Sequence, residues 1–75
     1  MSGLRRLRKE YRLSQEQVAR ALGYVGRGPI GAYERGEREL SLRSALGYSL
    51  LFNIPVPDLV PELVEEVKES MKVGD

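Results

Sequence analysis

Cysteine, histidine and tryptophan are all absent from this chain of 75 residues. Without cysteine the chain has no disulfide framework and no thiolate site. Without histidine it lacks the commonest metal ligand and the usual acid–base group near neutral pH. The apolar runs are too short to span a bilayer, and the N-terminus lacks the apolar stretch of a signal peptide. We therefore expect one small cytoplasmic domain that contacts no membrane and holds no metal ion or cofactor.

The polar residues that are present form no catalytic set. Ser41 and Ser44 have no base nearby in the sequence to activate a hydroxyl group. Glu62 and Glu66 lie one helical turn apart, but no further ligand converges on them, so a solvated helix face is the better interpretation. We predict that the protein is not an enzyme and has no catalytic residue.

The net charge of +1 conceals a strong asymmetry along the chain. Residues 1–38 contain nine Lys or Arg and four Glu, for a net charge of +5. Residues 39–75 contain three Lys or Arg and seven Asp or Glu, for a net charge of −4. Such a local positive region suits contact with a polyanion, although charges that only keep the surface soluble remain an alternative.

Two short helices around a glycine-rich turn are predicted between Ser14 and Gly36. Ser14 and Gln17 have the spacing of a capping box, in which each side chain satisfies a free backbone N–H at the start of a helix over residues 15–22. Gly23 ends this helix, because glycine adopts the left-handed conformation at little cost. The inward-facing positions at helical spacing are Val18, Ala21 and Leu22.

The second of these helices is expected over residues 27–35, with Ile30 and Tyr33 pointing inward. Its start is open between two positions: Gly28 as the N-cap with Pro29 in the first helical position, or Gly26 half a turn earlier. Two short helices joined by a tight turn form the unit that lays a helix in the major groove of DNA.

Other helices are expected on both sides of this unit. One runs from about Ser2 to Tyr11, with Leu4, Leu7 and Tyr11 inward. Another begins after a Ser41 cap and ends at Asn53, which suits the left-handed position after a helix. Its predicted packing positions are Leu42, Ala45, Leu46, Ser49, Leu50 and Phe52, with Gly47 allowing close helix packing. Tyr33 and Tyr48 are expected in the core with their hydroxyl groups near the surface, and Asp58 and Leu59 in a short helical turn.

The last helix is predicted from Pro61 to about Lys72 and is amphipathic. Its apolar positions follow an i, i+3, i+4, i+7, i+11 pattern, and acidic and basic residues cover the other side. We predict a dimer interface in which two such helices pair across a two-fold axis. The alternative is that the helix folds back onto its own core. The predicted interface residues are Val60, Leu63, Val64, Val67 and Met71.

From about Leu4 to Leu59 the sequence resembles the Cro/repressor-like (XRE-type) helix-turn-helix DNA-binding domains. The resemblance rests on Leu13 to Ala19, Ala21 to Gly23, Ile30, Tyr33 to Gly36, Ser41-Leu42, Asn53-Ile54 and Asp58-Leu59. It implies an all-α, five-helix lambda-repressor-like domain at residues 1–60. The predicted C-terminal helix, within residues 61–75, lies beyond the usual end of the family's domain. Two departures are a turn one residue longer than usual and the glycine-rich segment Gly28, Pro29, Gly31 in the recognition helix.

The resemblance also implies DNA-contacting residues. Gln15 corresponds to a phosphate-facing position at the start of its helix. Phosphate-contacting positions fall on Gly26, Arg35 and Arg38, and base-facing positions fall on Arg27, Gly28 and Ala32. Arg27 is the base-facing residue able to grip guanine bidentately, although a phosphate contact is an open alternative. Arg8 and Glu34 match a structural ion pair of the family, and Tyr24 is left open between packing over the turn and contacting DNA.

These observations predict a sequence-specific transcriptional regulator, in the first place a repressor. Its partner would be double-stranded DNA, and it would bind a near-palindromic operator as a homodimer. A protein-binding adaptor or antitoxin-like module with the same fold remains the alternative, because the recognition helix is rich in glycine.

Overall fold

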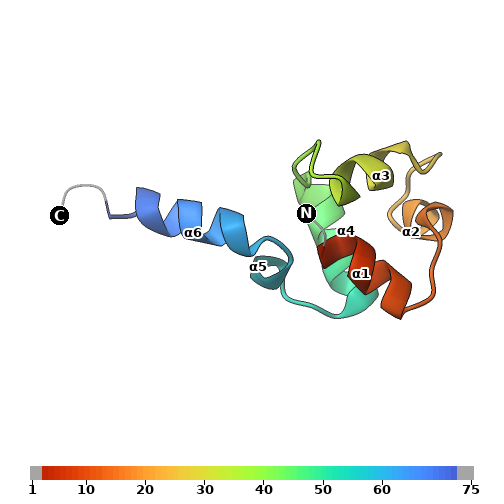
Figure 1. The fold of residues 1–75 in the computed structure, drawn as a ribbon, viewed down its shortest axis with the longest axis horizontal. Helices are drawn as coiled ribbons and strands as arrows, with labels where there is room; N and C mark the ends of the chain where they lie inside the picture. Colours follow the sequence, from red (N-terminus) through yellow and green to blue (C-terminus); the bar gives the residue numbers. More distant parts are fainter. Residues whose placement is uncertain (1–2, 73–75) are drawn as a thin grey trace.

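The computed structural model describes residues 3–72, and every regular secondary-structure element within that range is a helix. This confirms the predicted all-α class. A body made of α1 to α5 is followed by α6, which extends away from it, so that the molecule measures 46 × 20 × 19 Å (Figure 1). The helices are α1 Gly3–Glu10, α2 Gln15–Ala21, α3 Gly28–Glu34, α4 Leu42–Phe52, α5 Val56–Leu59 and α6 Pro61–Ser70.

Local capping signals placed the ends of α2 and α4 correctly. Ser14 Oγ accepts a hydrogen bond from the Gln17 N–H at 3.0 Å, and Gln17 Oε1 accepts one from the Ser14 N–H at 2.7 Å. Ser41 caps α4 by accepting from the backbone N–H of Ser44. Asn53 ends α4 with a left-handed φ of 55°. Each of these contacts satisfies a backbone group that a helix end leaves free.

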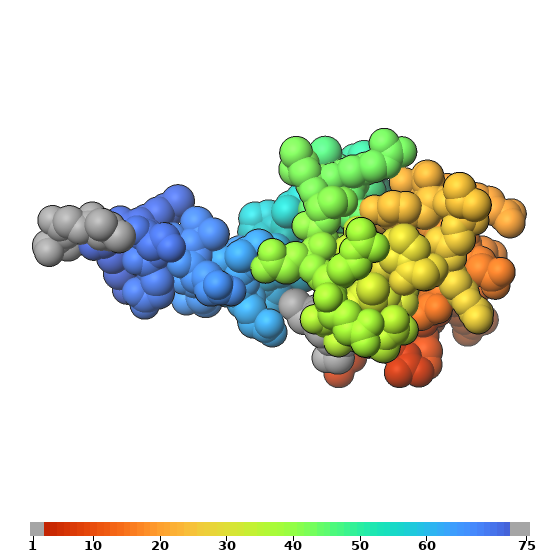
Figure 2. Space-filling model, turned by 90° about the horizontal axis from the view of Figure 1, so that it is seen from above, coloured from red at the N-terminus to blue at the C-terminus, as the bar shows by residue number. Residues whose placement is uncertain are grey.

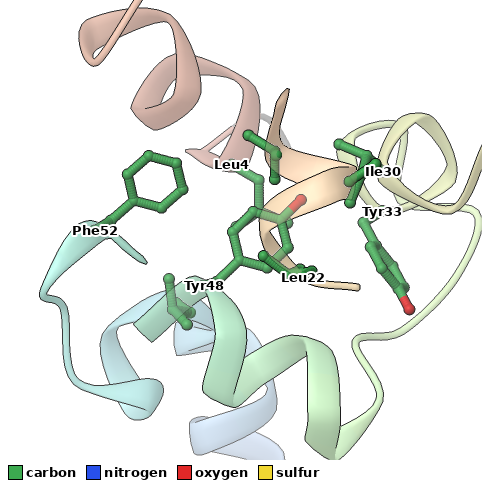
Figure 3. Packing of buried hydrophobic residues seen from close by; sticks show 9 residues of the cluster. Leu4, Leu22, Ile30, Tyr33, Tyr48 and Phe52 are labelled. Carbon is green, nitrogen blue, oxygen red and sulfur yellow. The ribbon is translucent and has the colours of Figure 1, made fainter. Parts of the chain in front are cut away.

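The core lies where α1 to α5 meet (Figure 3). Burying one large apolar side chain contributes about 1.5–3 kcal/mol, so a few such residues hold a small domain together. Gly47 allows α4 to approach α2 closely, because a Cβ atom there would lie 2.6 Å from Leu22 Cγ. The core residues are Leu4, Val18, Ala19, Leu22, Ile30, Tyr33, Tyr48, Phe52 and Leu59.

The predicted packing face of α4 was partly wrong. Ala45 and Phe52 are buried as expected, but three leucines of the predicted face are exposed. Tyr48 is buried as expected of a core residue, and Ser44, which was not among the predicted packing positions, is buried as well, with 0% exposure each. Because α4 carries apolar residues on several sides, its sequence alone does not define which side faces the core. The exposed residues are Leu42, Leu46 and Leu50.

Two smaller corrections concern residues expected to face inward, and a third concerns a hydroxyl group expected near the surface. Tyr11 is 51% exposed, although its ring lies edge-on against Phe52 with the centroids 4.9 Å apart. Ala21 is exposed, and the neighbouring Ala19 is buried. The hydroxyl of Tyr48 does not reach the surface, and burial raises the pKa of this phenol well above its ordinary value.

Helix α6 buries none of its residues. It continues outward from α5, which contradicts the alternative that it folds back onto the core (Figure 1). It ends at Ser70, slightly before the expected boundary, and residues 73–75 of the predicted C-terminal unit, like Ser2 of the first helix, lie outside the described residues. None of the helices within residues 3–72 has the length and apolar character needed to cross a membrane.

Candidate nucleic-acid interface

The α2–α3 unit has the two-helix arrangement predicted from the sequence. The backbone N–H of Leu22 donates to Val18 O, and that of Tyr24 donates to Ala19 O, so the chain turns directly after α2. Gly23 has a φ of +85°, a conformation that is strained for residues with a Cβ atom. The segment from there to Gly28 carries the chain to α3 and is mostly exposed.

Tyr24 fastens this long turn to the rest of the body. Its hydroxyl hydrogen-bonds to the Tyr33 hydroxyl at 3.0 Å and to Ser44 Oγ, and the latter two groups are themselves 3.0 Å apart. Hydrogen bonds with Ser44 and Tyr33 lower the pKa of the Tyr24 phenol. The question left open by the sequence is thereby answered: Tyr24 packs over the turn and links it to α3 and α4.

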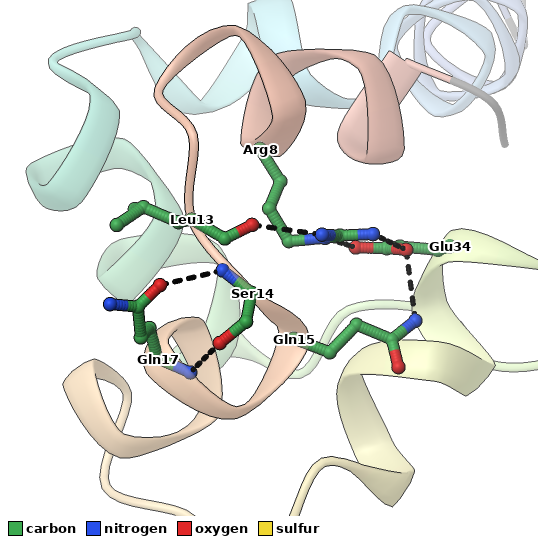
Figure 4. Close-up of polar contacts among 6 residues, drawn as sticks. All are labelled: Arg8, Leu13, Ser14, Gln15, Gln17 and Glu34. Carbon is green, nitrogen blue, oxygen red and sulfur yellow. Dashed lines mark hydrogen bonds and ion pairs between the residues drawn. The ribbon is translucent and has the colours of Figure 1, made fainter.

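A buried ion pair connects α1 to the end of α3 (Figure 4). Arg8 Nε donates to Glu34 Oε2 at 2.6 Å, Arg8 Nη2 donates to Glu34 Oε1 at 3.1 Å, and the two side chains are 11% and 4% exposed. Arg8 Nη1 also donates to Leu13 O at 2.9 Å, just before α2. The structural role predicted for this pair is confirmed, and it ties both helices of the unit to α1.

Glu34 also holds Gln15 at the first position of α2. Gln15 Nε2 donates to Glu34 Oε1 at 3.1 Å (Figure 4). Burial alone would raise the pKa of Glu34, but the hydrogen bonds from Arg8 and Gln15 outweigh it, and the pKa falls below its ordinary value. The carboxylate is therefore ionised near neutral pH, and Gln15 is oriented before any ligand arrives.

Because Gly31 has no side chain, it leaves room over the backbone of α3 for the side chains of Gln15 and Arg35. A Cβ atom at Gly31 would lie 2.9 Å from Arg35 Nη1 and 3.6 Å from Gln15 Nε2. Arg35 also pairs with Glu37, with Nε 3.1 Å from Oε2, and both side chains are 60% exposed. The Gln15 amide and the Arg35 guanidinium thus both lie over the backbone of α3 at Gly31.

The predicted base-facing residues lie at the start and middle of α3. Arg27 is the N-cap residue, Gly28 is the first helical residue and Pro29 lies in the first turn, so the helix starts between the two predicted positions. Gly26, Arg27 and Gly28 are exposed, whereas Ala32 is half-buried. The residues predicted to contact DNA are therefore accessible at the start of α3, and the methyl group of Ala32 is less accessible than they are.

Arg38 lies apart from Gln15 and Arg35. Its guanidinium carbon is 5.8 Å from the centroid of the Tyr33 ring, which is within the range of a cation–π contact. It lines a cleft of about 400 Å³ between the α3–α4 loop and the α5–α6 junction. Arg38 is exposed, so it can still reach a ligand, but from a position that differs from that of Arg35.

Three features of the site were not anticipated from the sequence. The first is the hydrogen bond from Gln15 to Glu34, the second is the hydroxyl cluster around Ser44, and the third is the space provided by Gly31. A signal for the second existed: Ser44 lies in a helix of mostly apolar residues, where a buried hydroxyl needs a hydrogen-bond partner. No local signal pairs Gln15 with a residue in another helix.

Comparison with known proteins agrees with this geometry. The model of the helix-turn-helix family HTH_3 matches residues 4–59, which is the body and excludes α6. A curated relative, the cryptic phage CTXphi transcriptional repressor RstR of Vibrio cholerae, is 32% identical over 71 residues. That match covers 95% of this chain and 63% of the relative, so the chain spans less than two thirds of the relative's length.

Proposed function

The chain belongs to the helix-turn-helix family, and we propose that it is a transcriptional regulator, acting as a repressor, that binds double-stranded DNA in a sequence-specific manner. Its relative from Vibrio cholerae is a transcriptional repressor, which supports this assignment. The observation that carries the proposal is the pre-oriented surface of the α2–α3 unit, where Gln15 is held by Glu34 beside the exposed Arg35.

This surface suits a phosphate group between two contacts. Gln15 Nε2 uses one proton for Glu34 and keeps a second for a ligand. Arg35 offers a guanidinium group whose present partner, Glu37, is equally exposed, and such exposed pairs are weak in water. A phosphate can therefore replace Glu37 at Arg35 while Gln15 keeps its orientation, which sets the register of α3 on the duplex.

Base recognition would depend on few side chains. Arg27 extends from the N-cap of α3 and is able to donate two hydrogen bonds to guanine O6 and N7. Gly28 lets the backbone come close to the groove, and Ala32 offers part of a methyl group to thymine. With one strong base contact in each subunit, the shape of the DNA and the spacing of the half-sites should supply much of the specificity.

The proposed active form is a homodimer on a near-palindromic operator, assembled through the apolar stripe of α6. Leu63, Val67 and Met71 are 40%, 45% and 76% exposed in the single chain. A continuous apolar stripe of this kind is a common mark of a protein–protein contact. A two-fold axis would place two recognition helices about 34 Å apart, one turn of DNA.

A mobility-shift assay with random and operator-like duplexes at two salt concentrations tests the proposal. We expect DNA binding that weakens steeply with salt, with a slope of about 0.9 in log affinity per phosphate contact. Arg35→Ala and Arg38→Ala should each weaken binding to all sequences and flatten the slope. Lys72→Ala is the matched control, because it removes one exposed cation from α6 and should change little.

Failure to shift any duplex at low salt would contradict the proposal. The protein-binding adaptor would then be the better interpretation, and the glycine-rich α3 would be part of a protein contact. If Lys72→Ala weakens binding as much as Arg35→Ala does, the binding depends on total charge, and the surface over Gly31 is not the phosphate site.

A further inference from the structure

Two ridges of large apolar side chains lie exposed on this chain. The first is the α4 ridge, Leu42, Leu46 and Leu50, whose side chains are 77%, 50% and 82% exposed. The second is the α6 ridge, Leu63, Val67 and Met71, described above. Soluble proteins seldom leave contiguous apolar surface uncovered without a partner for it.

The two ridges match each other in spacing. In each, the three residues follow at i, i+4 and i+8, so each ridge is about 12 Å long at a rise of about 1.5 Å per residue. Rows with four-residue spacing on two helices interdigitate at a crossing angle of about −50°, the commonest packing class in globular proteins. In such a crossing, the central residues Leu46 and Val67 lie closest together.

The two ridges of one chain meet only at one end. Leu42 and Leu63 line the same cleft between the α3–α4 loop and the α5–α6 junction, but the rest of each ridge extends away from it. Val60 alone separates α5 from α6, so no loop allows α6 to reverse over its own α4. Figures 1 and 2 both show α6 directed away from the body, so its outer turns lie far from α4. A contact along the full length of the two ridges, with Val67 close to Leu46, must therefore come from a second copy of the chain.

Charge favours this contact over the pairing of α6 with α6. Residues 61–72 contain four Glu and two Lys, for a net charge of −2, whereas residues 3–59 contain ten Lys or Arg and six Asp or Glu, for a net charge of +4. Arg43 lines the same shallow groove as the α4 ridge. An acidic helix laid on a basic body is attracted to it, and two acidic helices repel each other.

We propose that two copies exchange their C-terminal helices, so that the α6 ridge of each packs across the α4 ridge of the other. The dimer then has two equivalent contacts related by a two-fold axis, and both ridges are removed from water. This proposal rests on the dimerisation in the proposed function, but it does not require that the dimer binds DNA.

Cysteine cross-linking tests the exchange, because the chain has no cysteine of its own. Leu46→Cys and Val67→Cys are made as separate single variants; both positions are about half exposed, so folding should not change. Mixed in equal amounts and oxidised, they should yield a covalent dimer that reducing agent reverses. Roughly half of the dimers are mixed when two variants pair at random, so at most this share should cross-link. Each variant alone should stay uncross-linked.

The matched control replaces Val67→Cys by Glu65→Cys, which lies on the opposite side of α6 and should give no cross-link with Leu46→Cys. Cross-linking of Val67→Cys alone would overturn the proposal in favour of α6 against α6. A third variant carries both Leu46→Cys and Val67→Cys in one chain. An internal cross-link within its monomer would overturn the proposal in favour of folding back. No cross-link in the mixture, or a monomeric wild-type protein, would also overturn it.

The proposed function and the proposed helix exchange can each be refuted without the other. The wild-type protein and the cross-linked mixture are both tested in the mobility-shift assay described above. DNA binding without the mixed cross-link refutes the exchange alone, and the mixed cross-link without any DNA binding refutes the regulator alone.

Discussion

The body and α6 differ in what covers the apolar faces of their helices. In the body other helices of the same chain cover them, whereas nothing within residues 3–72 buries the apolar face of α6. In the body, even charged side chains are buried, because Arg8 and Glu34 neutralise each other across α1 and α3. Helix α6 has an equally regular apolar stripe and yet buries nothing. The difference shows that an amphipathic pattern predicts a helix with a buried face, but not whether the covering surface belongs to the same chain.

The connections explain the difference. Within the body, loops of several residues let α1 to α4 turn and pack on one another, and only a single residue separates α5 from α6. The body can be disrupted by unpairing one buried charge, and α6 can be altered without touching the core. Two predictions test this division, and two more test DNA recognition by the body. They are ordered by the size of the expected effect.

The largest effect is expected from Glu34→Ala. It leaves the buried Arg8 guanidinium without its carboxylate, which should destabilise the fold by about 3–5 kcal/mol in urea unfolding. The double variant Arg8→Met, Glu34→Leu should recover most of this loss, since it removes both charges together. Equal instability of the single and double variants would show that packing, and not the unpaired charge, dominates at this position.

The double variant Val67→Asp, Met71→Asp tests whether α6 is independent of the body. Because both residues are exposed in the single chain, its unfolding free energy at low protein concentration should change by no more than about 0.5 kcal/mol. Affinity for a full operator should fall by about 10²-fold or more, as the advantage of two linked sites is lost. Affinity for a half-site should stay the same. A large loss of stability in the monomer would contradict the independence of α6 from the core.

Arg27→Ala probes recognition within the body. If Arg27 grips guanine, the variant should lose about 1–3 kcal/mol of binding free energy, concentrated at one base pair of each half-site. Binding to a library of single-base operator variants measures this directly. Arg35→Ala serves for comparison, with a uniform loss over the library. The same uniform loss for Arg27→Ala would assign it to a phosphate.

The smallest effect is expected from Glu37→Gln. Glu37 pairs with Arg35 and holds the pKa of this guanidinium above its ordinary value. If Arg35 binds a DNA phosphate as proposed, Glu37 competes with that phosphate. Removing its charge should strengthen DNA binding a few-fold at low salt and steepen the salt dependence. Glu39→Gln provides a control that removes a nearby negative charge without freeing Arg35. Unchanged affinity in Glu37→Gln would mean that Arg35 does not meet the phosphate backbone.

Much of the fold followed from local sequence signals. The capping box at Ser14, the cap at Ser41 and the left-handed Asn53 each act within a few residues of their own helix end. Such contacts form wherever the local sequence allows, so the boundaries of α2 and α4 were predictable. Two short helices around a glycine-rich turn indicated the helix-turn-helix unit, and the resemblance of the motifs between Leu13 and Gly36 to Cro/repressor-like domains indicated its family.

The candidate site was only partly predictable. The sequence placed Gln15, Arg27 and Arg35 on the α2–α3 unit through their resemblance to family positions, and all remain accessible in the structure. It did not reveal that Glu34 orients Gln15, or that Tyr24 fastens the turn to Ser44. These contacts join residues that are 19 and 20 positions apart, and side-chain chemistry alone does not select one distant partner among several.

By itself, therefore, the sequence determined the helices, their caps, the unequal charge of the two halves and the family of the fold. The tertiary structure decided which side of α4 is buried, where α3 begins, and that α6 leaves the body. The physical reason is range. Backbone capping and helical periodicity act over about one turn of helix, whereas burial depends on which elements the connections allow to meet.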